Sequence, residues 1–195
     1  MTKKLKVLAI IPAYNEEGKV GNVVKKTLPY ADRVLVVDDG SNDNTWNEAS
    51  NNGAFVIKHV KNMGVGAAIR SGIKYALQNN FDVCVPLGGD DQDNPKEIPK
   101  LIEYINKGHD FVQGSRYLKG GKTVNIPLFR LITTKIFSFF FSLVVGHHIS
   151  DASNGFKAFK TSIIKDKRIN LRQNWLNRYE LESYLFYKAI KLNYK

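Results

Sequence analysis

Residues 83–95 read VCVPLGGDDQDNP, and this stretch predicts both the class of fold and the place where the chain binds its ligands. The apolar run that ends at Leu87 is typical of a strand buried on both faces, and two glycines stop it. Three carboxylates follow within four positions, on Asp90, Asp91 and Asp93. A strand that ends in this way delivers its carboxylates to the carboxyl edge of a sheet, where open α/β folds bind ligands. Crowded carboxylates favour a cation among them, although a solvated acidic turn ahead of a helix has the same pattern.

The first half of the chain alternates between strands and helices. Apolar runs predict strands at residues 6–13, 33–39, 54–60, 81–87 and 110–116, with helices near 17–27, 44–51 and 95–107 and within 61–80. Strict alternation with short loops predicts an α/β fold with a doubly wound, mostly parallel sheet and helices on both faces. We find no internal repeat or low-complexity linker and expect one domain across residues 1–195. Because the last residues, LNYK, show no cap or turn, we expect this domain to be truncated at its C-terminus.

The composition is that of a globular protein from a reducing compartment. A chain of 195 residues with 43% hydrophobic and 24% charged residues can bury a full core. Its single cysteine, Cys84, lies inside an apolar run, so we expect a buried thiol and no internal disulfide. We expect no signal peptide, because the first apolar run is short and leads into Pro12. We also expect no transmembrane span, because no apolar stretch reaches about eighteen residues.

The net charge of +11 is carried by the second half of the chain. Residues 1–106 contain 13 basic and 13 acidic side chains, whereas residues 107–195 contain 16 and 5. This asymmetry favours an anionic partner for the second half, such as a lipid phosphate, an anionic membrane surface or nucleic acid. We recognise no motif that reads nucleic acid, so we do not expect that partner. Charge alone is also compatible with a basic surface that serves only solubility.

Residues 126–146 read IPLFRLITTKIFSFFFSLVVG and predict a Phe-rich helix that carries Arg130 and Lys135. Its longest uncharged run, residues 136–146, has 11 residues and is too short to span a bilayer. The pattern favours a helix that lies in the membrane interface with its cations at the headgroups, and an ordinary core helix has the same pattern. An exposed apolar surface of this size also predicts self-association into a homo-oligomer.

The glycines of residues 62–72, NMGVGAAIRSG, match only part of a dinucleotide-binding fingerprint, because Ile69 stands where the third glycine belongs. Close packing of a helix on a strand explains these glycines as well.

Six motifs occur in order along nearly the whole chain: IPAYNEE, VVDDGSNDNT, NMGVGAAIRSG, LGGDDQDNP, GSRYLKGG and DASNGFKAF. In this order the chain resembles the family-2 glycosyltransferases, and among them the synthases that load sugars onto dolichyl or undecaprenyl phosphate. Any one motif is modest, but six in register are highly specific.

The resemblance implies a Rossmann-like GT-A fold and transfer of a sugar from a UDP- or GDP-sugar. It implies a nucleotide-sugar half at about residues 1–116 and an acceptor-binding, membrane-facing half at about residues 117–195. The nucleotide-binding residues that it implies are Pro12, Tyr14, Glu16, Val37, Asp39, Gly88, Gly89 and Asp90.

The family's Asp-x-Asp-x-Gln motif falls on residues 88–92, and the resemblance implies a Mg2+ or Mn2+ site on Asp90, Asp91 and Gln92. Gly88 stands where the family has its first aspartate, and this departure weakens the expected metal site. Asp91 or Asp93 could substitute for the missing carboxylate, or water could fill the position, because Mg2+ keeps several waters.

On the acceptor side, the resemblance implies four cationic residues that bind the lipid phosphate: Arg116, Arg130, Lys135 and Lys157. Arginine suits forked phosphate contacts, and positive charge brings the lipid phosphate beside a second anion. With Asp90 and Arg116, we expect Asp151 to act in catalysis by orienting the acceptor or the sugar, and a turn role in the DASNG loop fits it too. A lipid phosphate is already anionic, so direct attack needs no strong base and would invert the anomeric centre.

We therefore expect a peripheral enzyme on the cytoplasmic side of a membrane that loads a sugar onto a polyprenyl phosphate. The alternative is a soluble family-2 enzyme that acts on a sugar or glycan, for which a carboxylate base would be required. A non-catalytic nucleotide-sugar or lipid-binding module is a third hypothesis, because of the glycine at position 88.

Overall fold

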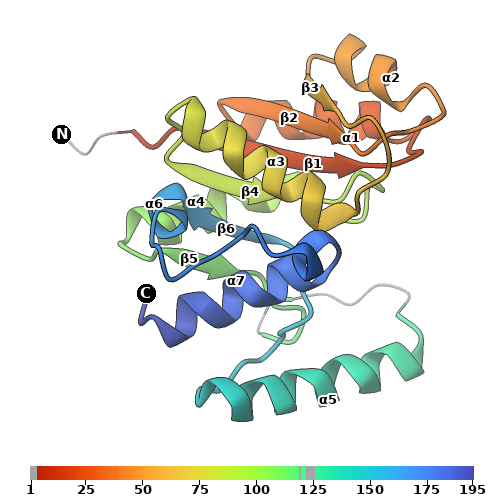
Figure 1. Ribbon diagram of the computed structural model, residues 1–195. Helices are drawn as coiled ribbons and strands as arrows, with labels where there is room; N and C mark the ends of the chain where they lie inside the picture. Colours follow the sequence, from red (N-terminus) through yellow and green to blue (C-terminus); the bar gives the residue numbers. More distant parts are fainter. Residues whose placement is uncertain (1–3, 119, 122–125) are drawn as a thin grey trace.

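The sheet of this protein has six strands among residues 4–118, 120–121 and 126–195, which are the residues that the computed structural model describes (Figure 1). Its strand order is β3-β2-β1-β4-β6-β5. The strands are β1 (Val7–Ala13), β2 (Arg33–Asp38), β3 (Phe55–Lys58), β4 (Val83–Pro86), β5 (Phe111–Gln113) and β6 (Lys157–Lys160). The helices are α1 (Val20–Thr27), α2 (Thr45–Asn51), α3 (Val65–Gln78), α4 (Ile98–Asn106), α5 (Leu128–Val145), α6 (Thr161–Ile164) and α7 (Glu180–Lys191). Three short 3-10 helices are η1 (Leu28–Tyr30), η2 (Pro95–Glu97) and η3 (Asn174–Asn177).

Strands β1 to β4 form the parallel part of the sheet. Strand β1 pairs with β2 and β4, and β2 pairs with β3, all in parallel, which confirms the doubly wound, mostly parallel arrangement. Strand β6 is not among the strands that the sequence predicts, because four residues are too few to show a clear period. It lies antiparallel between β4 and β5, so the sheet is mixed at this end.

Alternate residues of β1 point to opposite faces of the sheet and belong to two separate cores. Ala9 and Ile11 pack with α1, α2 and α4, whereas Leu8 and Ile10 pack with α3, α6 and α7. Cys84 is fully buried in the second core, as expected for a core thiol. Helices thus cover both faces, and the carboxyl ends of β1, β2 and β4 remain uncovered together at one edge of the sheet (Figure 1).

Helix α5 lies outside both cores, beyond α7 (Figure 1). Only Ser138 and Val145 of its 18 residues are buried, so the interpretation of this segment as a core helix is wrong. Phe129 is 78% exposed and Leu143 is 63% exposed. By length and composition alone, with a mean hydropathy of 1.7, the helix could cross a membrane. The expectation of no span counted only the uncharged run of 11 residues, whereas all 18 residues of α5, with Arg130 and Lys135 included, make the helix a candidate span.

One side of α5 is attached to the rest of the domain. Phe141 stacks on Phe186 of α7 with ring centroids 5.3 Å apart, and Phe186 stacks on Phe111 of β5 at 5.5 Å. Ser138 Oγ accepts a hydrogen bond from the amide of Ala152 at 2.9 Å. These contacts hold α5 against the second half of the domain while its opposite face stays exposed.

Candidate active site

The carboxyl ends of β1, β2 and β4 meet at one edge of the sheet, and the segments that follow them are in contact. A Cβ on Gly89 would lie 3.1 Å from the carbonyl oxygen of Pro12, so the glycine lets the loop after β4 pass close to the end of β1. The amide of Asp39 donates to the carbonyl of Ala13 at 2.8 Å. The structure therefore brings Pro12, Asp39 and Gly89, with the adjoining Asp90, to one edge.

The loop after β1 is fastened to the loop after β2. The amide of Asn15, whose φ is +53°, donates to Ser41 Oγ at 3.0 Å. The amide of Glu16 donates to Thr45 Oγ1 at 2.8 Å. Tyr14 stands between these anchored strand ends and is 43% exposed, so its ring is accessible to a ligand.

Asp39 is buried at the end of β2, and its carboxylate accepts several hydrogen bonds. It accepts hydrogen bonds from the amides of Met63 and Gly64, the latter at 2.7 Å. His59 Nδ1 lies 2.6 Å from Asp39 Oδ1, and His59 Nε2 lies 2.8 Å from Ser71 Oγ. In this structure Asp39 thus organises the loop between β3 and α3, and its contact with a nucleotide base stays a prediction.

The glycines before α3 do not form an open phosphate cradle. A Cβ on Gly64 would collide with the carbonyl of Asn177, and a Cβ on Gly66 would collide with the carbonyls of Leu176 and Arg178. Close packing of the α3 N-terminus against the segment at η3 explains these glycines, and the partial dinucleotide fingerprint has no structural counterpart here.

In the loop after β4, the carboxylates of Asp90 and Asp93 both lie close to Gly88. A Cβ on Gly88 would lie 2.8 Å from Asp90 Oδ1 and 3.6 Å from Asp93 Oδ2, and the Gly88 amide donates to Asp93 Oδ2 at 2.8 Å. Asp91 has a φ of +64° and a different partner, because it accepts a hydrogen bond from Lys26 Nζ at 2.7 Å. The structure therefore places Asp93, rather than the predicted Asp91, beside Asp90.

The donor atoms in this loop fit a Mg2+ or Mn2+ ion that completes its shell with phosphate and water. Within the described ranges, no three acidic, histidine or cysteine side chains form a metal-binding group. Mg2+, however, is commonly held by one or two carboxylates together with substrate phosphates. Asp90 offers such a carboxylate, and its Oδ1 would lie 2.8 Å from a Cβ on Gly88. Gln92 is exposed on the same loop, and its backbone amide contacts Asp90 Oδ1 at 3.2 Å.

Val37 and Lys157, predicted to bind the nucleotide and the acceptor, both lie below the surface. Val37 is fully buried in the core, and Lys157, at the start of β6, is 3% exposed. The ammonium of Lys157 pairs with the carboxylate of Glu182 on α7 at 3.2 Å. Burial raises the pKa of the Asp93 carboxyl, and the negative charges of Asp90 and Glu182 also raise it. Lys157 therefore belongs to a buried group of charges behind the acidic loop, and its contact with an acceptor stays a prediction.

Arg116 and Asp151 join the segment after β5 to the segment before β6. The guanidinium donates two hydrogen bonds to the carboxylate, and its Nη2 also donates to Ser153 Oγ at 2.6 Å. Burial alone would raise the pKa of Asp151, but the hydrogen bonds from Arg116 outweigh it and hold that pKa below its usual range. The same hydrogen bonds raise the pKa of Arg116. Asp151 is thus an ionised partner of Arg116.

Tyr117 connects Arg116 to helix α5. Its hydroxyl lies 2.6 Å from Thr134 Oγ1. The guanidinium of Arg116 and the ammonium of Lys135 each lie 5.7 Å from the centre of its ring. Arg130 is exposed four residues before Thr134, on the same side of the helix. We call Arg116, Tyr117, Arg130, Thr134 and Lys135 the Tyr117 cluster. It contains predicted phosphate-binding cations from two segments of the chain.

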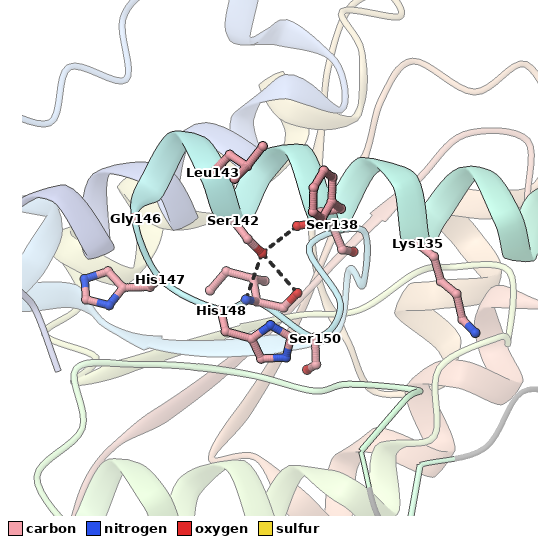
Figure 2. Close-up of a pocket in the computed structure, with 10 residues that line it drawn as sticks. Lys135, Ser138, Ser142, Leu143, Gly146, His147, His148 and Ser150 are labelled. Atoms are coloured by element: carbon pink, nitrogen blue, oxygen red, sulfur yellow. Dashed lines mark hydrogen bonds between the residues drawn. The ribbon is translucent and has the colours of Figure 1, made fainter.

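A hollow of about 520 Å3 runs beside the C-terminal half of α5, between the helix and the segment that follows it (Figure 2). Ser142 Oγ accepts from the amide of Ile149 at 2.9 Å and so holds this segment near the helix. Lys135 lies at one end of the hollow and His147 at the other. Because Lys135 also contacts Tyr117, the hollow begins at the Tyr117 cluster.

Sequence reasoning missed Tyr117 and Glu182 as residues of the site. Tyr117 directly follows Arg116 in the GSRYLKGG motif, and this neighbourhood is the signal that points to it. Glu182 carries no local signal, because its partner Lys157 lies on a different element and only the tertiary fold joins them.

The chain is similar in sequence to known glycosyltransferases. The model of glycosyl transferase family 2 matches residues 8–167. The chain is 35% identical to the UDP-N-acetylglucosamine--dolichyl-phosphate N-acetylglucosaminyltransferase of Methanococcus voltae, across 99% of this chain and 84% of that protein. It is 35% identical to the dolichol-phosphate mannosyltransferase of Pyrococcus furiosus, across 85% of this chain and 49% of that protein. It is 31% identical to the undecaprenyl-phosphate mannosyltransferase of Micrococcus luteus, across 83% and 69%.

The fold is also that of solved enzymes. Glucosyl-3-phosphoglycerate synthase from Mycobacterium tuberculosis, crystallised with Mn2+, uridine diphosphate and glucosyl-3-phosphoglycerate, superposes with a TM-score of 0.62 at 20% identity, across 82% of this chain and 58% of that chain. Mannosyl-3-phosphoglycerate synthase from Rubrobacter xylanophilus superposes with a TM-score of 0.65 at 20% identity, across 82% and 54%. This chain thus spans just over half of these solved chains, and the expected GT-A fold is confirmed. Because the family model covers most of its length, the chain belongs to glycosyl transferase family 2.

Proposed function

We propose that this chain transfers a sugar from a nucleotide-diphosphate sugar to a polyprenyl phosphate at the cytoplasmic surface of a membrane, with inversion of the anomeric centre. The observation that carries this proposal is the Tyr117 cluster, where Arg116 and Lys135 converge between the sheet and the exposed helix α5. The named relatives support the acceptor class, because their names contain dolichyl, dolichol or undecaprenyl phosphate.

The states of the Asp151 and Glu182 carboxylates fit a phosphate acceptor. A hydroxyl acceptor needs a base that takes its proton, and a useful base has a pKa near the working pH. Asp151 is held ionised by Arg116 with a lowered pKa, and Glu182 is paired with Lys157. A phosphate oxygen carries its own negative charge and can attack the anomeric carbon directly, so neither carboxylate has to act as a base.

The charge around α5 supports an anionic acceptor in an anionic membrane. The sequence has no acidic residue between Asp110 and Asp151, and this stretch contains five lysines and arginines. Basic residues near a membrane surface are attracted to anionic lipids by about 1 kcal/mol each. Arg116 and Lys135 at the Tyr117 cluster would hold the acceptor phosphate, and Arg130 lies on the same side of α5.

The donor would lie along the carboxyl edge of the sheet. In this proposal Tyr14, Glu16 and Asp39 would meet the nucleoside there, and Asp90 would meet the diphosphate. A divalent cation held by Asp90 would neutralise the charge that develops on the leaving nucleoside diphosphate. Gly89 lies close to Pro12, so the acidic loop would border the proposed nucleotide site.

Helix α5 supplies the membrane-facing surface in this proposal. Its exposed Phe, Leu and Ile side chains would enter the boundary of headgroups and acyl chains, which is the depth at which amphipathic helices bind. Ser138 and Phe141 attach the other side of the helix to the domain, so a helix lying along the surface fits these contacts better than a detached span. The hollow that begins at Lys135 lies where the first isoprene units of an acceptor would follow its phosphate (Figure 2).

The experiment that tests this function has two steps. Thermal shift with a panel of UDP- and GDP-sugars, with and without Mg2+ or Mn2+, identifies the donor by the rise in melting temperature. The selected donor is then incubated with undecaprenyl or dolichyl phosphate in vesicles, and with soluble sugars in parallel. Glycosylated lipid phosphate of inverted configuration supports the proposal. Transfer to soluble sugars alone would favour a soluble family-2 enzyme, and donor binding without any transfer would favour a binding module.

A further inference from the structure

We propose that Asp93 supplies the second carboxylate of the metal site and so replaces the aspartate that Gly88 lacks. The proposal rests on the proposed function, since it concerns the divalent cation that the donor diphosphate would bring to Asp90. It changes the ligand set that sequence comparison implies, because Asp91 and Gly88 are then not ligands and Asp93 is.

The first argument is the geometry around Gly88. A Cβ at this position would lie 2.8 Å from Asp90 Oδ1 and 3.6 Å from Asp93 Oδ2. A carboxylate carried by residue 88 would therefore project into space that the carboxylates of Asp90 and Asp93 already border. Asp93 reaches this place from five residues further along the chain, and the absence of a side chain on Gly88 leaves room there for the Asp90 carboxylate.

The second argument concerns the free lone pairs of Asp93. The amide of Gly88 donates to Asp93 Oδ2 at 2.8 Å, which fixes the carboxylate beside the backbone of residue 88. Asp93 Oδ1 takes no hydrogen bond from the residues that the structure describes. One oxygen therefore orients the group, and the other is available to a cation.

The third argument removes Asp91 from the site. Its backbone has a φ of +64°, which is the left-handed region, and its side chain leaves the loop in another direction. Both of its oxygens accept hydrogen bonds from Lys26 Nζ, at 2.9 and 2.7 Å, and Asn22 donates to Oδ2 at 2.8 Å. A cation at Asp91 would have to displace the ammonium of Lys26, whereas neither Asp90 nor Asp93 forms an ion pair with a described residue.

The charge balance behind the loop also fits this assignment. Lys157 is buried, and its ion pair at 3.2 Å is with Glu182 rather than with Asp90 or Asp93. Two carboxylates with the oxygens of a diphosphate satisfy a Mg2+ or Mn2+ ion, which usually keeps several waters. With only two protein ligands, tight metal binding should require the nucleoside diphosphate.

The test measures Mn2+ binding by electron paramagnetic resonance of the free ion, with the full chain and saturating UDP or GDP. Asp93→Asn and Asp91→Asn each remove one negative charge from the same loop, so Asp91→Asn is the matched control. We expect Asp93→Asn to weaken Mn2+ binding by about tenfold or more, and Asp91→Asn to change it little. Metal-free melting curves check that both variants fold, and the amide oxygen introduced by Asp93→Asn can still accept the hydrogen bond from the Gly88 amide.

The outcomes separate this proposal from the proposed function. If the parent binds Mn2+ with a nucleoside diphosphate and Asp93→Asn binds it equally well, the assignment of Asp93 is wrong while the proposed function stands. The same holds if Asp91→Asn weakens binding as much as Asp93→Asn does. If neither UDP nor GDP gives the parent any Mn2+ binding, the metal-dependent donor site fails, and the Asp93 assignment fails with it.

Discussion

The guanidinium of Arg116 meets the carboxylate of Asp151 at two points, with Nε 2.8 Å from Oδ2 and Nη2 2.9 Å from Oδ1. Asp151 is 2% exposed, so this pair is shielded from water on the carboxylate side. Removing one partner of a buried ion pair leaves an uncompensated charge, and this is the costly way to break such a pair. The pair should therefore stabilise the fold as well as position Arg116 for an acceptor.

Arg116→Gln should lower the free energy of unfolding by about 3 kcal/mol, because Asp151 then stays buried without its cation. Urea unfolding followed by circular dichroism measures the change. Arg168→Gln is the matched control, because Arg168 also meets Asp166 at two points but is mostly exposed. Equal losses in the two variants would contradict the importance of burial.

The contribution of Asp151 should depend on pH in one direction. Its pKa in the folded state lies below the ordinary value of 3.8, so its stabilisation is present above that value and is lost as the pH falls through the folded-state pKa. Urea unfolding of the parent and of Asp151→Asn should differ by a constant amount from pH 7 to about pH 5, and the difference should shrink below about pH 4. A difference that stays constant down to about pH 3 would show that the charge of the Asp151 carboxylate does not stabilise the folded protein.

Lys157 and Glu182 should show strong energetic coupling. Lys157→Met leaves Glu182 without its partner and should cost about 3 kcal/mol, because the lysine side chain is 4% exposed. The double variant with Glu182→Gln should cost less than the sum of the two single changes. The unfolding free energies of the parent, the two single variants and the double variant complete a double-mutant cycle. Additive losses would show that Lys157 and Glu182 do not stabilise each other.

Replacing Arg130 and Lys135 with Gln should weaken binding to vesicles that contain anionic lipid by about tenfold or more, since each cation near the surface contributes about 1 kcal/mol. Nucleotide binding should persist, because none of the residues expected to bind the nucleotide lies on α5. Cosedimentation at low and high salt gives the measurement, and salt should weaken binding without abolishing it.

Lys165→Gln with Lys167→Gln is the control for that experiment, because it removes the same charge from exposed positions near α6. If both double variants bind vesicles equally, the cations of α5 do not bind the membrane surface. The hypothesis of a soluble family-2 enzyme then gains support.

Gly88→Asp should tighten Mn2+ binding and destabilise the metal-free protein. Gly88 is not among the residues with a positive φ, so a side chain there causes no backbone strain. Its Cβ would nevertheless lie 2.8 Å from Asp90 Oδ1, and the new carboxylate would repel both Asp90 and Asp93 when no cation is present. Melting temperatures with and without Mn2+ measure both effects, and no change in either would show that position 88 is irrelevant to the site.

Much of the parallel sheet could be predicted from the sequence, because a strand buried on both faces needs a continuous apolar run. Strands β1, β2 and β4 each lie within such a run, and their carboxyl ends carry Pro12, Asp39 and Asp90 to one edge. Helix α5 could be placed but not assigned to core or surface, since an apolar helix has the same pattern in either setting.

The sequence by itself therefore determined the class of fold and the family to which the chain belongs, because both depend on local periodicity and on motifs in order along the chain. Only the tertiary structure decided which carboxylates share a site. Asp91 and Asp93 are two residues apart, yet a left-handed backbone at Asp91 sends one to Lys26 and leaves the other beside Asp90. Lys157 and Glu182 become partners only because β6 and α7 pack together. Side-chain direction and long-range packing decide such contacts, and neither leaves a periodic trace in the sequence.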